Sequence, residues 1–84
     1  MNDHEYFIIK LKTDAIKIPS QEGAYYSLDM DIFTLNGNYL KALTTTFYDE
    51  KGNFNNLLKA NTEWKIVCIP KLNNGIIKII EQLS

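Results

Sequence analysis

The residues of this sequence that could do chemistry are few and lie far apart. His4 is the single histidine and Cys68 the single cysteine, and two distant ligands do not make a zinc site. Asp29 and Asp31 point to the same side of a predicted strand and could hold a hard cation or act as acid and base, but one strand supplies too few ligands. No nucleophile motif or phosphate-binding glycine loop is present. We therefore predict a protein that is not an enzyme and needs no metal or cofactor.

Cys68 lies in the apolar run from Ile66 to Ile69, which predicts a small buried side chain; a reactive thiol is the alternative. A single cysteine cannot form an internal disulfide, and this fits the reducing cytoplasm. The first five residues are polar and acidic, so we expect them to be frayed and not to form a secretory signal. No run of about 18 apolar residues is present, so we expect no contact with a membrane.

The charge balance bears on possible partners. The chain has nine lysines, no arginine and a net charge of −1, so no strong long-range attraction draws nucleic acid to it. Arginine is the usual reader of guanine edges, and its absence disfavours sequence-specific DNA recognition. The abundance of Ile, Lys and Asn indicates an AT-rich genome, such as that of a low-GC bacterium or one of its mobile elements.

Binding has more support than catalysis, because ten aromatic residues exceed what so small a core needs. Exposed rings on a strand can stack on the bases of a single strand, although they can also shield cross-strand hydrogen bonds or pack on a loop. Lysines of the first predicted strand could add a basic strip, or could serve only solubility. The predicted nucleic-acid-binding residues are Tyr25, Phe33, Tyr39, Tyr48, Lys10 and Lys12. Asp29 and Asp31, on the same predicted face with no lysine opposite, would repel a phosphate backbone.

A second predicted surface belongs to the last hairpin. Apolar and basic side chains alternate on the side that faces away from the predicted core, and an exposed apolar patch of this kind marks a protein contact. Burial under the helix and the first strand is the alternative. The predicted partner-binding residues are Val67, Ile69, Lys71, Ile76, Lys78 and Ile80.

Period-2 patterns and Asn-Gly turns predict the elements that position these residues. We expect a long first strand over 6–18, with a bulge near Thr13-Asp14 that turns Ile16 and Ile18 inward. The predicted second strand spans 24–35, and a two-residue turn at Asn36-Gly37 leads into the third. An apolar stripe at i, i+3 and i+4 predicts a short helix over 54–61. The last two strands are expected over 64–72 and 76–82.

The turn positions also predict the strand register. Asn36-Gly37 as a two-residue turn pairs Phe33 with Leu40, and Asn74-Gly75 pairs Ile69 with Ile80. The same register places Lys41 inward. The residues predicted to form the core are Tyr26, Leu28, Met30, Ile32, Leu43, Phe47, Leu57 and Ile66.

The order strand, strand, strand, helix, strand, strand resembles the OB-fold, a five-stranded Greek-key barrel. The resemblance covers Tyr6 to Gln82 within a single domain, 1–84, and the segment Glu63–Pro70 followed by a turn and Ile76–Ile80 looks like the last two strands of such barrels. An SH3-like barrel is the alternative, and the helix between the third and fourth strands argues for the OB-fold. The fold class that we predict is therefore all-β with one short helix.

The resemblance implies a function. Small OB proteins of bacteria and mobile elements are commonly single-strand binders or accessory subunits of replication and repair enzymes. We expect a non-catalytic accessory that binds single-stranded DNA, a partner polymerase, primase or helicase, or both, and that self-associates if its apolar hairpin is exposed. The alternative is a protein-binding module without nucleic-acid affinity, such as a phage- or mobile-element-encoded inhibitor whose acidic aromatic face imitates DNA.

Overall fold

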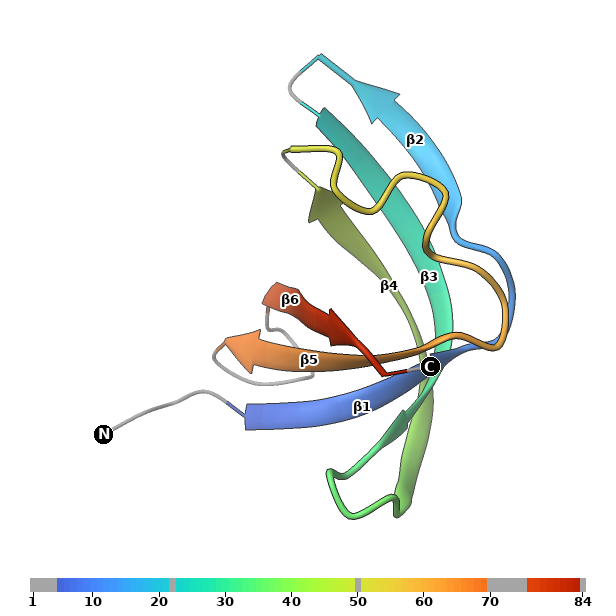
Figure 1. Cartoon of the computed structure of the whole chain (residues 1–84), viewed down its shortest axis with the longest axis vertical. Helices are drawn as coiled ribbons and strands as arrows, with labels where there is room; N and C mark the ends of the chain where they lie inside the picture. Colours follow the sequence, from blue (N-terminus) through green and yellow to red (C-terminus); the bar gives the residue numbers. More distant parts are fainter. Residues whose placement is uncertain (1–4, 22, 50, 70–75, 84) are drawn as a thin grey trace.

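The computed structural model describes residues 5–21, 23–49, 51–69 and 76–83. Within these residues the chain forms one curled antiparallel sheet and no helix (Figure 1). The strands are β1 (Glu5–Leu11), β2 (Ile16–Ser20), β3 (Gly23–Phe33), β4 (Tyr39–Asp49), β5 (Glu63–Ile69) and β6 (Ile76–Gln82). The prediction of an all-β, barrel-like chain is confirmed at this level.

β3 is the central strand of the sheet. One edge of β3 pairs with β4 along its length, and the other edge pairs with β2 and then β1, which lie end to end. β1 also pairs with β5, and β5 with β6. Glu5, which we expected to be frayed, is the first residue of β1 and lies opposite Cys68. The sheet therefore curls into a half-barrel with β4 and β6 at the two sides of its opening.

The predicted first strand is interrupted between Leu11 and Ile16. Here Ala15 N–H donates to the carbonyl oxygen of Leu58, and the Asp14 carboxylate accepts the N–H of Ala60, so the chain turns toward the loop after β4. The predicted inward turn of Ile16 and Ile18 is wrong. The odd-numbered inward parity of β1 continues through the break, so both isoleucines lie on the outer face and are 67% and 53% exposed.

The β3–β4 hairpin has the predicted register through its body, including Tyr25 opposite Tyr48, Met30 opposite Leu43 and Ile32 opposite Lys41. The turn is one residue longer than predicted. Thr34 N–H donates to Asn38 O and Gly37 N–H to Thr34 O, with Gly37 at φ 89°, as in a three-residue loop that ends on a glycine. A register shift next to Phe33 pairs it with Tyr39 and not with Leu40, and this compensates for the extra loop residue.

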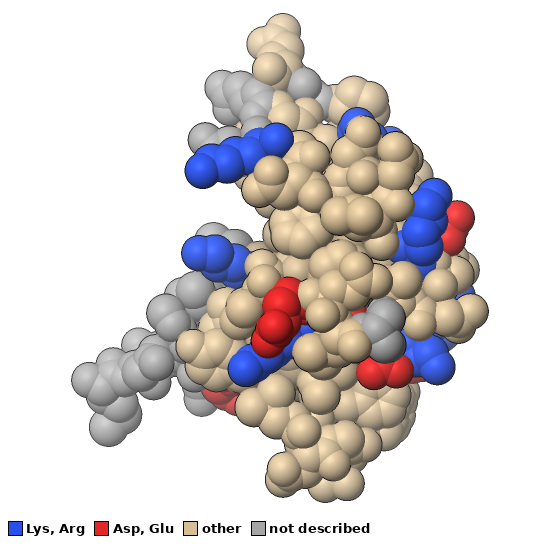
Figure 2. Space-filling model, in the orientation of Figure 1, with Lys and Arg blue, Asp and Glu red and all other residues tan. Residues whose placement is uncertain are grey.

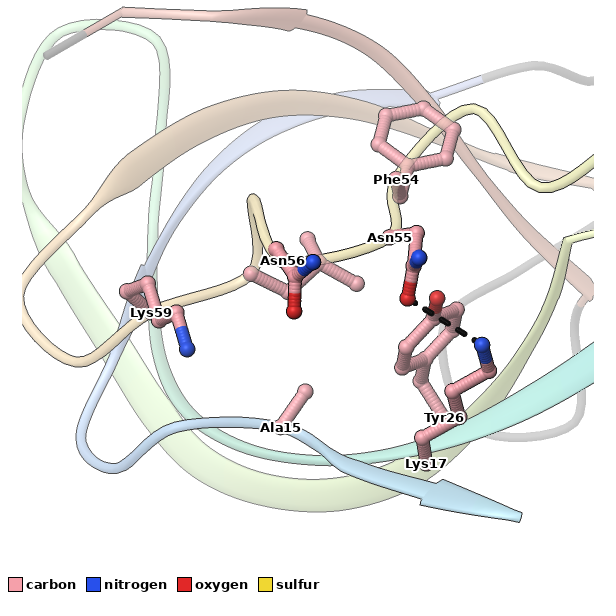
Figure 3. A pocket seen from close by; sticks show the side chains of 8 residues that line it. Ala15, Lys17, Tyr26, Phe54, Asn55, Asn56 and Lys59 are labelled. Atoms are coloured by element: carbon pink, nitrogen blue, oxygen red, sulfur yellow. Dashed lines mark hydrogen bonds between the residues drawn. The ribbon is translucent and has the colours of Figure 1, made fainter. Parts of the chain in front are cut away.

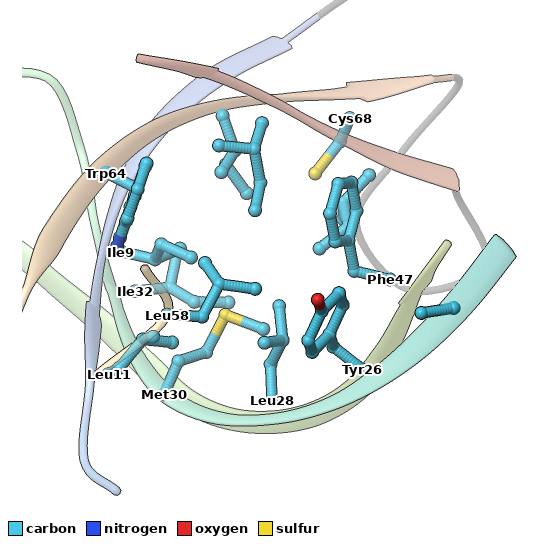
Figure 4. Close-up of a cluster of buried hydrophobic side chains, with 14 residues drawn as sticks. Ile9, Leu11, Tyr26, Leu28, Met30, Ile32, Phe47, Leu58, Trp64 and Cys68 are labelled. Atoms are coloured by element: carbon cyan, nitrogen blue, oxygen red, sulfur yellow. The ribbon is translucent and has the colours of Figure 1, made fainter. Parts of the chain in front are cut away.

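The core lies inside the curl, where the side chains of β1, β3, β5 and β6 meet (Figure 4). Most of the predicted core is confirmed: Tyr26, Leu28, Met30, Ile32, Phe47 and Ile66 are buried. Leu43 is partly buried and packs against this cluster. Leu57 is an error of the prediction, since it is 46% exposed.

Leu57 is exposed because the predicted helix over 54–61 is absent. The segment forms turns in which Asn56 and Asn61 adopt φ of 64° and 68°, values that asparagine tolerates and a right-handed helix excludes. Two turns of helix are too short to persist on propensity. The Asp49 carboxylate instead accepts the N–H groups of Asn53 and Phe54 at 3.2 and 2.9 Å, which fixes the start of the loop.

The β5–β6 hairpin differs from its predicted register. Ile69 lies opposite Ile76, and Ile66 opposite Ile79, so Ile80 is not the partner of Ile69. The predicted turn at Asn74-Gly75 lies outside the described residues. A hairpin register depends on its loop geometry, and an Asn-Gly pair defines the register only when those two residues alone form the turn.

Candidate nucleic-acid interface

The four predicted ligand-binding aromatics form two separate pairs on the β3–β4 hairpin. Tyr25 and Tyr48 have ring centroids 4.8 Å apart with planes inclined by 38°, and the rings of Phe33 and Tyr39 meet edge to face at 5.7 Å. From Tyr25 to Phe33 the strand advances about 25 Å, at roughly 3.3 Å per residue. The two pairs are therefore distinct surfaces, one at each end of the hairpin.

The pair of Tyr25 and Tyr48 continues into an apolar surface that the sequence-based prediction missed. Ile18 lies opposite Tyr25 in β2, and Tyr25 lies opposite Tyr48 in β4, so the three side chains form one row on the outer face. Ile16 lies two residues along β2 on the same face. We call these four residues the outer apolar row. The sequence carries no signal for this placement of Ile16 and Ile18, because its apolar residues change to even positions there while the inward-facing positions of the structure stay odd.

A groove adjoins Tyr48 on the side where the half-barrel is open. Within the described residues β4 pairs only with β3, and β6 only with β5, which leaves a groove of about 480 Å³ between them. Figure 2 shows the notch with basic side chains on both of its sides. The exposed lysines Lys51 and Lys78 line the groove, together with Tyr48 and Ile80. Aromatic surface and positive charge therefore meet at Tyr48.

The acidic residue of this groove is held inward. Asp49 is 4% exposed, and its two carboxylate oxygens accept the backbone N–H groups of Asn53 and Phe54. Hydrogen bonds from backbone donors offset much of the field of a buried carboxylate. Lys51 and Lys78 therefore present the exposed charge of the groove.

Asp29 and Asp31 occupy the middle of the hairpin, as predicted, but they have basic neighbours. The prediction that no lysine lies opposite them is wrong on the β1 side, where Lys10 pairs with Asp31 in the register and Lys12 N–H donates to Asp29 O. Lys10 also lies opposite Glu63. Lys10 and Lys12 therefore flank this acidic stretch, and the structure does not bring them to the Tyr25–Tyr48 end.

The predicted partner-binding hairpin exposes less apolar surface than expected. Val67 is 5% exposed and lies between Tyr6 and Lys78 in the register, so Val67 is not part of an exposed patch. The Lys65 ammonium lies 5.4 Å from the centre of the Tyr6 ring on the same face. Ile80 is 44% exposed and Lys78 is exposed, and both line the groove. Ile69 and Ile76 pair with each other, and Lys71 lies outside the described residues.

Cys68 is fully buried, as expected, and is a free thiol. Burial raises the pKa of this thiol, and Glu5 raises the pKa further while Lys41 lowers it. A raised pKa keeps the thiol protonated and a poor nucleophile near neutral pH.

The raised pKa of Cys68 predicts a pH dependence of stability. Its contribution is complete below the pKa of an unfolded thiol, about 8.5, and is lost as the pH rises through the higher pKa of the folded state. The free energy of unfolding of the wild type, measured by urea denaturation, should therefore fall more steeply above about pH 8 than that of Cys68→Ala. Parallel curves for the two proteins would contradict this account.

Two further kinds of site receive no support from the described residues. Among them, no three His, Cys, Asp or Glu side chains gather closely enough to hold a metal ion. The same part of the chain contains no helix with the length and apolarity needed to cross a membrane.

Fold and surface together define the class of protein as an all-β half-barrel whose surface offers an exposed tyrosine pair beside a lysine-lined groove. Comparison with known proteins finds no family model, no curated protein and no solved structure that matches the chain.

Proposed function

We propose that this protein is an OB-like module that binds single-stranded nucleic acid at the Tyr25–Tyr48 pair. Two halves of one bent strand, β1 and β2, together with β3, β4, β5 and β6, make five strands in a partly open antiparallel barrel, which supports the OB architecture. OB domains bind oligonucleotides on the face of their second and third strands, which correspond here to β3 and β4.

The observation that carries this proposal is the position of Tyr48. Its ring packs against Tyr25 at a tilt and also lines the groove of Lys51 and Lys78. Bases that stack on exposed tyrosines leave their phosphates at the edge of the platform, where the two ammonium groups can pair with them. This is the combination of stacking surface and basic groove that sequence-tolerant single-strand binders use.

A net charge of −1 and two groove lysines predict modest affinity for the isolated protein. The proposal therefore extends to an accessory role in DNA replication or repair in the cytoplasm, in which a polymerase, primase or helicase adds to the binding surface. No catalytic step is part of this role.

Replacing Tyr48 by alanine should weaken the binding of labelled oligo-dT, measured by fluorescence anisotropy at low salt. Each stacked base contributes about 1–3 kcal/mol, so the expected rise in Kd is roughly 5- to 150-fold. Tyr39→Ala is the matched control, because Tyr39 is 57% exposed but lies at the other end of the hairpin. Lys51→Gln should lower the slope of log K against log salt by about 0.7, the value for one phosphate contact with a single strand.

Three outcomes decide the proposal. If Tyr48→Ala loses affinity for oligo-dT and Tyr39→Ala does not, the binding site lies at the Tyr25–Tyr48 end of the hairpin, beside the groove. If both variants lose affinity equally, the binding site is not confined to the groove end, and the proposal is contradicted. If the wild type shows no binding to oligo-dT even at high micromolar concentration, stand-alone binding of single strands is rejected.

A protein-binding module is the second candidate, and the outer apolar row favours it. Ile16 and Ile18 expose most of their surface on β2, an edge strand with one free side within the described residues. An exposed apolar edge strand favours a contact with another polypeptide. This candidate predicts that Ile18→Asp abolishes self-association, measured by light scattering, or else abolishes the capture of a partner enzyme. The same substitution should leave oligo-dT binding unchanged.

A further inference from the structure

The groove between β4 and β6 has a sheet edge on each of its two sides. In the part of the chain that the structure describes, no strand pairs across it. The Cα atoms of β4 and β6 approach within 8 Å, and Figure 1 shows the two strands diverging toward the end of β4 and the start of β6. An added strand needs about 4.7–4.9 Å on each side, so the groove admits one where the two edges diverge.

The free edge of β4 presents backbone hydrogen-bonding groups. The carbonyl oxygen of Asp29 accepts the N–H of Lys12, so the backbone groups of Asp29 point toward the side of β1 and β2, and those of its neighbours in β3 point toward β4. Backbone directions alternate along an antiparallel pair. Thr44, which lies opposite Asp29, and Thr46 therefore turn their N–H and C=O groups away from β3. A row of such groups is matched by another extended polypeptide.

The floor of the groove is apolar and fixed in position. Phe47 and Ile79 belong to the core, and the partly buried Phe54 meets Phe47 edge to face at 5.2 Å. The Lys17 ammonium donates to Oδ1 of Asn55, the residue after Phe54, at 3.1 Å (Figure 3). This bond holds the loop that carries Phe54. The floor is therefore formed in advance and suits apolar side chains on the inner side of an added strand.

The rim of the groove is positive. Lys51 and Lys78 are exposed, and Figure 2 shows basic side chains on both sides of the notch. Lys78 lies between the inward-facing Ile77 and Ile79 on β6, so its side chain points to the outer side. Asp49, the acidic residue that lines the groove, is buried and bonded to two backbone N–H groups. Charge complementarity favours acidic side chains on the outer side of an added strand.

We infer that an extended segment of a partner protein, with alternating acidic and apolar side chains, adds to the free edge of β4 in this groove. Its apolar side chains contact Phe47 and Phe54, its acidic side chains pair with Lys51 and Lys78, and its backbone bonds to Thr46. The contact does not depend on nucleic-acid binding. Because a single strand would use the same two lysines, the bound segment competes with it.

The probe for this contact is a fluorescein-labelled hexapeptide of alternating glutamate and valine. Its binding to the whole chain is measured by fluorescence anisotropy at low salt, without nucleic acid, and the wild type should bind it. The same peptide with every backbone nitrogen methylated keeps its side chains and charges but donates no backbone hydrogen bond, so it should not bind. A hexapeptide of alternating lysine and valine should not bind either, because Lys51 and Lys78 repel it.

Reversing one charge of the groove should change the preference between the two peptides. In Lys78→Glu the Kd for the glutamate–valine peptide should rise about fivefold or more, and the Kd for the lysine–valine peptide should fall. Lys78 is exposed, so this variant should fold like the wild type. Lys12→Glu is the matched control, because Lys12 is also exposed but does not line the groove, and it should retain the wild-type preference.

Amide hydrogen exchange, followed by NMR, locates the added strand. The N–H groups of Thr44 and Thr46 should exchange more slowly with the glutamate–valine peptide than without it, because the peptide backbone pairs with this edge. The amides of β2, at another edge of the sheet, should not change. Unchanged exchange at Thr46 would place the peptide elsewhere and would overturn the proposal.

The binding assays also decide between the two ligands of the groove. No binding of the glutamate–valine peptide at millimolar concentration, or equal binding of its methylated form, would overturn the strand addition. An equal loss of affinity in Lys78→Glu and Lys12→Glu would overturn the groove as its place. If the wild type binds oligo-dT but not the peptide, the peptide site is rejected and the proposed function stands. If it binds the peptide but not oligo-dT, the peptide site stands and stand-alone binding of single strands is rejected.

Discussion

Replacing Leu28 by alanine should lower the free energy of unfolding by about 2–5 kcal/mol. Leu28 is fully buried at the middle of β3, the strand that pairs with β1, β2 and β4. The truncation removes apolar contacts and leaves a cavity that the surrounding strands can fill only in part. Since a domain of this kind has about 5–15 kcal/mol in total, the variant should lose a large share of its stability. Urea denaturation followed by circular dichroism measures the change.

Leu35→Ala is the matched control for this variant. Leu35 lies in the turn after β3 and is 51% exposed, so the same truncation there should change the free energy of unfolding by no more than about 0.5 kcal/mol. Equal effects of the two substitutions would contradict the position of Leu28 in the core.

Replacing Trp64 by alanine should cost about 3–5 kcal/mol, the range for a large aromatic residue in a core. Trp64 is 2% exposed, its Nε1 donates to Thr62 Oγ1 at 2.8 Å, and its ring meets Phe54 edge to face at 5.7 Å. Phe54 in turn meets Phe47 at 5.2 Å, so Trp64 connects the loop to both sides of the half-barrel. The loss should include about 0.5–1.5 kcal/mol for the aromatic pair beyond the buried area.

Two further variants separate packing from the loop contact. Trp64→Phe keeps an aromatic ring and should recover more than half of the loss, whereas Tyr39→Ala removes an aromatic ring that is 57% exposed and should have little effect on unfolding. If Trp64→Ala unfolds at the same urea concentration as the wild type, the loop is not held through Trp64.

The β3–β4 hairpin was predictable because two independent patterns agree there. Alternation from Tyr26 to Ile32 identifies the inward face, and the same face emerges when the strand is paired from its turn. The extra loop residue did not disturb the register, because a bulge near Phe33 absorbs it. In β5 and β6 both faces are apolar, so alternation does not restrict the register, and the position of the turn alone was not sufficient.

The errors elsewhere have a local physical cause. Phe54, Leu57 and Leu58 have helical spacing, but the asparagines among them favour turns, and Asp49 captures the first N–H groups of the segment in a loop. Only Phe54 and Leu58 then face the core. Ile16 and Ile18 were placed inward on the assumption that apolar residues are buried, although folded proteins expose much apolar surface.

The candidate site was predictable only in part: Lys51 was not predicted, and Lys78 was predicted for a partner-binding surface. Tyr25 and Tyr48 follow from the hairpin register. The groove with Lys51 and Lys78 depends on how far the sheet curls, which brings β4 and β6 near each other although they do not pair within the described residues. The curvature of the sheet cannot be predicted from the side-chain types and spacing along one strand.

The pairing of β1 with β5 also affects the order in which the chain can fold. A hairpin such as β3–β4 closes between neighbouring segments, on a time scale of about 1–10 μs, whereas Glu5 must find Cys68 across most of the chain. Such distant contacts incur the loop-closure entropy before they contribute stability, and they slow folding. During synthesis the inner side chains of β1, Ile9 and Leu11, therefore stay uncovered on their β5 side until the last third of the chain has left the ribosome.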